Sequence, residues 1–431
     1  MLRTDDHPFG QQQNGSVHGR LVPMTTPYSD DRWLAEQATD LEAFARKSRL
    51  PDGFGWQDSA GAVDREQPIH TWITCRMTFV FALAHLRGVP DSEGLVDHGL
   101  NALTGFLHDG EHDGWYASVD RDGRPHDERK AAYPHAFVVL AAAAASLAGR
   151  PGAAALLTAG LRVVQDRFWD ESAGRTLESY AADWSDSEPY RGANSSMHMV
   201  EAFLAAGDAT GDATWYERAL RICTHLIHGV AADRDWRLPE HYTEDWTPRP
   251  DYNAERPADQ FRPYGVTVGH LLEWARLLIH VEAALPDPPA WLLAEAVALF
   301  DAATSRGWTV DGADGFVYTL DWHDRPVVRE RMHWVTAEAI DTAAVLGRRT
   351  GDSRYADWYG AFWTFADRYF IDRVNGGWRH ELDATNRPSS TVWSGKPDTY
   401  HAYQATLIPR LPMAPSLAGA LAHPVPRGPT R

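Results

Sequence analysis

Histidine, carboxylate and aromatic side chains recur in this 431-residue sequence at or just before the start of an apolar helical segment. Six such segments are expected, and the residues at their starts are, in order, His70, Trp72 and Arg76; Tyr133 and His135; Asn194 and His198; His270 and Glu273; His333, Trp334 and Glu338; and Asp398 and His401. One histidine alone most often has a structural role, but recurrence at equivalent places favours a shared site. Imidazole, with an ordinary pKa of about 6.5, can accept and return protons near neutral pH.

His270 and Glu273 have a spacing that predicts direct contact. Residues three apart on a helix share a face, and a carboxylate beside an imidazole fixes its tautomer and raises its basicity. The neighbours Leu271, Leu272 and Leu277 make the segment apolar, which argues against an ordinary exposed helix pair. We therefore expect Glu273 to orient His270.

Sequence signatures of several other chemistries are absent. The chain has no G-x-G-x-x-G at a strand–helix junction, no Walker A loop and no H-E-x-x-H. Residues 192–196 (GANSS) do not form a nucleophile elbow. No pair among the 20 histidines has convincing metal-ligand spacing. We expect neither a metal nor an organic cofactor.

The elements that must position these side chains come from a repeated unit. An apolar-spaced helix, a Gly/Asp/Trp-rich turn, a polar aromatic stretch and a second, more apolar helix recur six times, with turns at 53–56, 113–116, 168–170, 230–263, 314–316 and 375–378. Such repeats stack their apolar faces on their neighbours. The pattern predicts an all-α (α/α)6 barrel with the apolar helices inside; an open α-solenoid is the alternative. In a barrel the starts of the inner helices share one end, so distant residues would meet in one cavity.

The repeats set the expected domain boundaries. Residues 1–24 are polar and lack periodicity, which predicts a disordered extension. Residues 25–412 form one catalytic domain, whose first helix would be capped near Asp30. Residues 413–431 are expected to form a Pro-rich tail.

Composition limits the partners. The net charge of −18, from 59 acidic and 41 basic residues, repels phosphate backbones and anionic headgroups, so we expect neither nucleic acid nor membrane partners. Cys75 and Cys223 cannot make a disulfide framework. The longest apolar run, 136–148, is too short to span a bilayer, and no secretory signal is visible. A cytoplasmic protein is expected, as a monomer or a homodimer.

The chain is rich in aromatic residues, with 18 Trp and 15 Tyr. Several tryptophans fall in the turns between helices: Trp56, Trp115, Trp308, Trp322, Trp378 and Trp393. Flat rings at a pocket mouth suit stacking on the C–H faces of sugars. For most of these tryptophans, packing between the turns of neighbouring hairpins is an equally good explanation.

Four segments carry a family resemblance: residues 70–77 (HTWITCRM), 194–202 (NSSMHMVEA), 269–274 (GHLLEW) and 395–404 (GKPDTYHAYQ). They resemble the N-acylglucosamine 2-epimerase superfamily, from about Trp33 to Pro409. The last segment is the most specific. It is similar to the aldose–ketose isomerase branch, which contains D-mannose isomerase and sulfoquinovose isomerase.

The resemblance implies an (α/α)6 barrel and cofactor-free chemistry, with His270 and His401 as the acid/base pair. The other catalytic residues expected are Glu273, His198 and Arg76. The substrate-binding residues expected are Trp72, Tyr133, Asn194, Trp334, Glu338, Trp393 and Asp398.

The implied reaction interconverts an aldose and a ketose, most simply D-mannose and D-fructose, through a cis-enediolate. The sugar ring opens, the proton on C2 is removed, and a proton is returned to C1. We assign ring opening to His401 and the proton shuttle to His270. Arg76 would stabilise the developing oxyanion.

Other functions stay open at this stage. A sugar 2-epimerase, of the N-acylglucosamine or cellobiose type, or a sulfoquinovose isomerase would use the same fold. An inverting glycoside hydrolase would need two carboxylates about 6.5–9.5 Å apart, for which Glu338 and Asp398 are the candidates. A non-catalytic sugar-binding scaffold is the last alternative. The histidines at the helix starts argue against the hydrolase and the scaffold.

Overall fold

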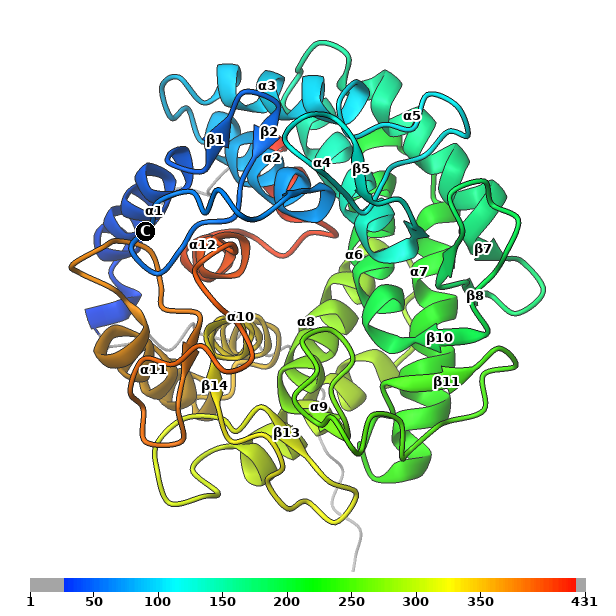
Figure 1. Ribbon diagram of the computed structural model, residues 1–431. Coiled ribbons are helices and arrows are strands. Elements are labelled where there is room, and N and C mark those ends of the chain that lie inside the picture. The colour runs from blue at the N-terminus through cyan, green and yellow to red at the C-terminus, as the bar shows by residue number, and fades with distance from the viewer. Residues whose placement is uncertain (1–26, 424–431) are drawn as a thin grey trace, which may run out of the picture.

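The computed structural model describes residues 27–423, which form two concentric rings of helices (Figure 1). The predicted extension, residues 1–24, lies outside the described residues. The outer helices are α1 (Asp31–Arg46), α3 (Glu93–Thr104), α5 (Ala153–Val163), α7 (Thr214–Cys223), α9 (Trp291–Gly307) and α11 (Arg354–Phe365). The inner helices are α2 (Thr71–Leu86), α4 (Ala132–Leu147), α6 (Ala193–Thr210), α8 (Val268–Ala284), α10 (His333–Thr350) and α12 (Tyr400–Leu407).

The last inner helix closes the ring onto the first. Each inner helix contacts the next, from α2 through α4, α6, α8 and α10 to α12, and α12 contacts both α1 and α2. The fold is therefore the expected (α/α)6 barrel rather than an open solenoid. None of the helices in residues 27–423 is both long enough and apolar enough to cross a membrane.

Hydropathy explains which helices lie inside. All residues of α2 from Thr71 to Ala84 are buried, and the alanines at 141–145 of α4 are fully buried. Small side chains there let neighbouring inner helices approach closely. The outer helices α1 and α3 bury one face each and carry charges on the other. Asp30 caps α1 as expected, because its carboxylate accepts a hydrogen bond from the Arg32 amide at 2.9 Å.

Short helical turns extend or flank several of these helices. The π-helical turns are η2 (Val164–Phe168), η3 (Thr224–Ala231) and η5 (Ala366–Phe370), which continue the outer helices α5, α7 and α11. The 3-10 turns are η1 (Pro27–Ser29), η4 (Ala232–Arg234) and η6 (Ile408–Arg410).

The linkers contain short antiparallel strands that join neighbouring hairpins. Strands β3 (Ile69–His70), β6 (Lys130–Ala131), β10 (Tyr190–Gly192), β12 (Val266–Thr267) and β14 (Arg331–Met332) directly precede inner helices. Their partners in the linker of the next hairpin are, respectively, β4 (Ser118–Val119), β9 (Ser179–Tyr180), β11 (His241–Thr243), β13 (Thr319–Leu320) and β15 (Glu381–Leu382). The remaining strands are β1 (Arg49–Leu50), β2 (Gly53–Phe54), β5 (Pro125–Asp127), β7 (Trp169–Asp170) and β8 (Arg175–Thr176). The starts of five inner helices, all except α12, are thus tied to the next linker.

The segment after α12 corrects one expected boundary. Residues 413–423 do not form a free tail, because helix α13 (Leu417–Ala422) contacts α2, α4 and α6. The Asp208 carboxylate accepts hydrogen bonds from the amide and hydroxyl of Ser416, at 3.0 and 2.6 Å. His280 bonds the Ala414 carbonyl at 2.7 Å. The domain therefore extends past residue 412, and the apolar Leu417 explains why α13 packs on it.

Close contact between α3 and α2 gives a stability prediction. A Cβ at Gly99 would lie 1.9 Å from the Thr78 hydroxyl, whereas a Cβ at Gly94 of the same helix would meet nothing within 4 Å. We expect Gly99→Ala to lower the free energy of unfolding by about 1–3 kcal/mol through overpacking. The matched control Gly94→Ala should raise it by about 0.4–1 kcal/mol. Urea unfolding measures both, and equal effects of the two substitutions would contradict the packing described.

Candidate active site

A cavity lies at the end of the barrel where the inner helices begin, with about 610 Å³ of empty space when the open solvent at its mouth is included. Eleven of the twelve residues expected at the site line it: Trp72, Arg76, Tyr133, Asn194, His198, His270, Glu273, Trp334, Trp393, Asp398 and His401. They come from every inner helix and from the linker before α12.

Equivalent helix positions form two layers around this cavity. The second residue of an inner helix supplies the wall, as Trp72, Tyr133, Asn194, Trp334 and His401. The sixth residue supplies the floor, as Arg76, His198 and Glu273. In α8 the second residue is Gly269, where a Cβ would lie 2.4 Å from the Trp334 ring. The glycine therefore leaves the space that this ring occupies.

His401 is oriented by a buried carboxylate. Its Nδ1 hydrogen-bonds Oδ2 of Asp398, and the same oxygen accepts from Nη1 of Arg76 at 3.1 Å. Although burial opposes it, the charges of His401 and Arg76 hold the pKa of Asp398 well below its usual range. Asp398 is therefore an ionised acceptor for Nδ1–H. This leaves Nε2 of His401, which has no partner among the described residues, as the base.

His270 is oriented in the same way, but not by the residue expected. Its Nδ1 lies 2.8 Å from Oε1 of Glu240, which directly precedes β11. The expectation that Glu273 orients His270 is wrong. Glu273 instead lies one turn deeper, with Oε1 3.7 Å from Nη2 of Arg276 and 3.7 Å from Nδ1 of His198. Burial and the neighbouring charge of Glu338 raise the pKa of Glu273 well above its usual range.

Trp334 connects the two histidines. Its ring centre lies 5.2 Å from that of His270 and 5.9 Å from that of His401. Both imidazoles, each with a carboxylate on Nδ1, thus contact the same indole. The arrangement places two proton acceptors in one cavity and fixes the orientation of each.

Arg76 is enclosed by aromatic rings. Its guanidinium carbon lies 4.4–5.0 Å from the ring centres of Phe137, Tyr400 and Trp72, and Nη2 donates to the Tyr133 hydroxyl at 3.0 Å. Cation–π contacts hold a guanidinium in place without neutralising it. Arg76 therefore fixes Asp398 and keeps positive charge beside the cavity.

Glu338, expected as a substrate contact, does not line the cavity. Its carboxylate is fully buried and accepts two hydrogen bonds from Arg276, at 2.7 and 3.0 Å. Arg276 also lies 4.0 Å from Glu201. Glu338 is the sixth residue of α10, like Glu273 in α8, but the salt bridge draws it below the floor of the cavity. An inner-helix position predicts the layer, and the local ion pair decides which side chain reaches the cavity.

Sequence reasoning missed several cavity residues. These are Gln260, Phe261, Pro263, Tyr318, His380 and Pro397, together with Glu240 behind His270. The rings of His333 and His380 stack with centres 3.9 Å apart. In the structure, Glu240, Tyr318 and His380 each directly precede a linker strand, but these short strands have no periodicity in the sequence that marks them.

Two histidines at helix starts do not line the cavity. His135 is structural, since its Nδ1 bonds the Ala131 carbonyl at 2.7 Å and its Nε2 accepts from the Trp115 amide at 3.2 Å. His70 lies beside a second, outer cavity. Recurrence at helix starts therefore finds the end of the barrel where the cavity lies, and not every residue that lines it.

Two groups of buried side chains have ligand atoms within 4.8 Å of one another, which is close enough to consider a metal ion: His333, Asp398 and His401, and Glu273, Glu338 and His401. The sequence had shown no such group. In the first, Asp398 already accepts from Arg76; in the second, Glu338 is paired with Arg276. A fixed guanidinium beside each group disfavours a second cation there.

Comparisons with known proteins agree on one family. The family model for N-acylglucosamine 2-epimerase (GlcNAc 2-epimerase) matches residues 53–405. A D-mannose isomerase of Thermobifida fusca is 62% identical over 392 residues, covering 90% of this chain and 96% of the relative. One of Pseudomonas cannabina pv. alisalensis is 52% identical over 395 residues, covering 91% and 95%. A crystal structure of D-mannose isomerase superposes with a TM-score of 0.83 at 29% identity, covering 89% of this chain and 98% of that one.

The buried histidines give a pH prediction. Burial lowers the pKa of His198 to about 3 and that of His333 to about 4, while each would bind a proton below about pH 6.5 when unfolded. Their contribution to stability is therefore full above about pH 6.5 and is lost as the pH falls towards 4. Glu273 and Asp341, whose pKa values are raised by burial, act in the opposite direction.

A single variant separates these effects. The drop in unfolding free energy between about pH 7.5 and about pH 5 should be smaller in His333→Gln than in the wild type, because the variant lacks one protonating group. Urea unfolding at the two pH values measures it. An identical drop in both proteins would contradict the buried neutral state of His333.

Proposed function

Because the chain belongs to the N-acylglucosamine 2-epimerase family, we propose that it interconverts D-mannose and D-fructose by transferring a proton between C2 and C1. The observation that carries the proposal is the pair of imidazoles, His270 and His401, each with a carboxylate on Nδ1 and both facing one cavity. The two similar bacterial proteins named D-mannose isomerase support this choice of sugar.

The chemistry follows from the protonation states. A carboxylate that accepts from Nδ1–H leaves Nε2 unprotonated and raises its basicity. Such a nitrogen can remove the C2 proton of the open-chain aldose, whose electrons move through C1 onto the carbonyl oxygen to give a cis-enediolate. Return of the proton to C1, with transfer of the C2 hydroxyl proton to the C1 oxygen, gives the ketose. No electron leaves the substrate, so no redox cofactor is needed.

We assign the two steps to different histidines. His401, backed by Asp398 and Arg76, opens the sugar ring by moving a proton between the ring oxygen and the C1 hydroxyl. His270, backed by Glu240, carries the proton between C2 and C1. Arg76 contributes positive charge near the developing oxyanion. Glu273, whose pKa is raised by burial and by the charge of Glu338, would face the substrate as a neutral hydrogen-bond donor.

The site fits a glycoside hydrolase poorly. An inverting hydrolase needs one carboxylic acid that gives up a proton and one carboxylate that activates water. Asp398 cannot act as that acid, because its pKa lies well below the usual range despite burial, owing to the charges of His401 and Arg76. Glu338 is held by Arg276 below the cavity. A 2-epimerase, which returns the proton to the other face of C2, is the remaining alternative.

The proposed setting follows from composition. With a net charge of −18 and two cysteines that are both free and buried, we place the protein in the cytoplasm, acting on a free monosaccharide without nucleic acid or membrane partners. It would work as a monomer or a homodimer.

The first test is the reaction itself. Purified protein in excess EDTA should convert D-mannose to D-fructose, and His270→Ala and His401→Ala should each lower kcat by about 10²–10⁴-fold. Both variants should stay folded, since each ring borders the cavity. Chromatography of the products measures the conversion.

Three results would redirect the proposal. Glucose formed from mannose with no ketose would favour a 2-epimerase. Reducing ends released from a glycoside would favour the hydrolase. Loss of activity in EDTA, restored by a divalent ion, would mean that His401 acts as a metal ligand.

The corrected partner of His270 gives a separate prediction. Glu240→Gln should lower kcat by roughly 10–100-fold, because the amide no longer fixes the imidazole tautomer. Glu244→Gln, which changes an exposed carboxylate in the same linker, is the control and should leave kcat unchanged. An unaffected Glu240→Gln enzyme would contradict the orienting role of Glu240.

A further inference from the structure

A second, larger cavity lies beside the first. This outer cavity has about 1710 Å³ of empty space when the open solvent at its mouth is included. Four residues line both cavities: Trp72, Tyr133, Asn194 and Phe261. Three of them are second residues of inner helices, whereas Phe261 comes from the long linker between α7 and α8. Phe261 is therefore the part of the shared wall that can change without altering a helix.

The Phe261 ring closes the space between the other aromatic walls. Its ring centre lies 5.2 Å from that of Trp393, 5.9 Å from that of Tyr133 and 6.4 Å from that of Trp72, all edge-on. The side chain is nevertheless 39% exposed, which is unusual for a large apolar group in this protein. Because the ring packs on three aromatic neighbours and also lines both cavities, it separates the inner cavity from the outer one.

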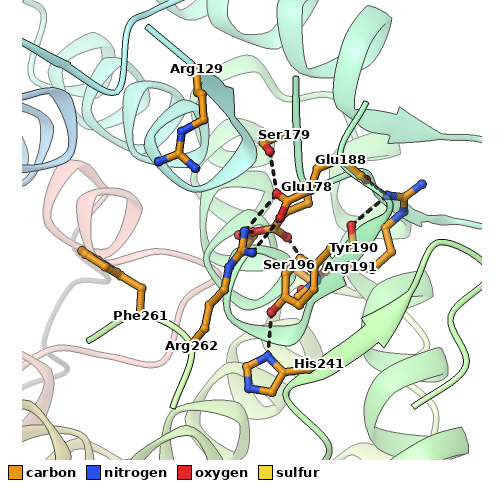
Figure 2. Close-up of polar contacts among 12 residues, drawn as sticks. Arg129, Glu178, Ser179, Glu188, Tyr190, Arg191, Ser196, His241, Phe261 and Arg262 are labelled. Atoms are coloured by element: carbon orange, nitrogen blue, oxygen red, sulfur yellow. Dashed lines mark hydrogen bonds and ion pairs between the residues drawn. The ribbon is translucent and has the colours of Figure 1, made fainter. Parts of the chain in front are cut away.

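Arg262, the next residue, holds the Phe261 segment in place. Its Nη1 and Nη2 donate to the two carboxylate oxygens of Glu188 at 2.7 and 3.0 Å. Its guanidinium carbon lies 4.0 Å from the ring centre of Tyr190. Figure 2 shows Arg262 directed toward these groups and Phe261 pointing away from them. A bidentate pair stacked on a ring fixes a side chain more firmly than a single exposed ion pair.

The backbone of the same segment is fixed as well. Oδ1 of Asp259 accepts from the amides of Phe261 and Arg262 at 3.1 and 2.9 Å. The Arg262 carbonyl accepts from the Asn253 side chain at 2.7 Å, and His241 bonds the Pro263 carbonyl at 2.7 Å. These contacts on both sides of Phe261 make it a fixed wall rather than a mobile lid.

We propose that Phe261 is the residue that limits the substrate to a single sugar ring, and that Arg262 is the residue that positions it. The inference rests on the proposed sugar isomerisation. Beyond Phe261, the outer cavity offers side chains of both signs, such as Asp127 and Arg129, which are paired with each other, with Ser179 and Tyr252 nearby. Mixed hydrogen-bonding groups of no net sign suit a neutral, hydroxyl-rich ligand. Without the ring, a second sugar linked to the reacting mannose could extend into this space.

Substitution of Phe261 tests the role of the ring. We expect the wild type to act on D-mannose and to be at least about 100-fold less efficient, in kcat/KM, on disaccharides with mannose at the reducing end linked through O3, O4 or O6. Phe261→Ala should raise KM for mannose roughly tenfold, through loss of aromatic contact. It should also raise kcat/KM for at least one disaccharide by a factor of about ten or more.

The possible results distinguish an error in the proposed function from an error in the role of Phe261. A wild type inactive on mannose would contradict the proposed function. A wild type active on mannose, with no gain on any disaccharide in Phe261→Ala, would contradict the role of Phe261 alone. A wild type that converts disaccharides as efficiently as mannose would also contradict the role of Phe261 alone.

Substitution of Arg262 tests the positioning role. Arg262→Met should shift the disaccharide-to-mannose ratio of kcat/KM in the same direction as Phe261→Ala, raise KM for mannose and leave kcat nearly unchanged. Arg262→Lys should restore part of the wild-type ratio. Arg234→Ala, which removes an exposed guanidinium of the same linker that lines neither cavity, is the control and should change neither KM nor the ratio.

The double variant separates positioning from stability. If Arg262 acts through Phe261, adding Arg262→Met to Phe261→Ala should not change the ratio further, because coupled residues are not additive. A lower Tm in Arg262→Met with an unchanged ratio would show a purely structural role. Additive changes in the ratio would mean that Arg262 acts independently of the ring. Either result would overturn the proposal for Arg262.

Discussion

One repeated hydrogen bond determines where this site can exist. The first backbone N–H of an inner helix donates to a carbonyl in the linker of the next hairpin. The five bonds are Thr71 to Ala117, Ala132 to Glu178, Ala193 to Glu240, Val268 to Tyr318 and His333 to His380, at 2.8–3.1 Å. Each satisfies a donor that a helix start leaves unpaired, and each brings a linker residue to the mouth of the barrel. Tyr318 and His380 line the cavity and Glu240 orients His270, so the same bonds that join the hairpins also assemble the site.

Charge burial is the second constraint. The floor and walls hold Asp398, Glu240, Glu273 and Glu338 out of water, which is costly unless each carboxylate is paired or protonated. Arg76 and Arg276 supply the pairing for Asp398 and Glu338, and His270 supplies it for Glu240. Glu273 has the weakest pairing of the four carboxylates, and burial together with the charge of Glu338 raises its pKa. The catalytic imidazoles are thus part of the electrostatic balance that keeps the barrel interior stable.

The sequence predicted what depends on local periodicity and recurrence. Six hairpins, a closed barrel and the wall residues at the second helix positions could be read from apolar spacing and repeated helix starts. The partner of His270 could not be predicted, because Glu240 lies 30 residues away in a linker without periodicity. Spacing showed that Glu273 shares a helix face with His270, but not that the imidazole turns toward the linker. Glu338 was misplaced for a related reason, since its ion pair with Arg276 crosses between two helices.

The central claim is that His270 moves a proton, and not a hydride, between C2 and C1. Isomerisation of D-mannose in D₂O, followed by NMR of the fructose at low conversion, tests this most directly. A proton held on an imidazole beside a wet cavity exchanges with solvent, so the account predicts deuterium at C1 of the product. It also predicts no deuterium at C2 of the mannose recovered from His270→Ala. Fructose that carries no solvent deuterium, with the C2 hydrogen transferred intact, would contradict the account and indicate a hydride shift.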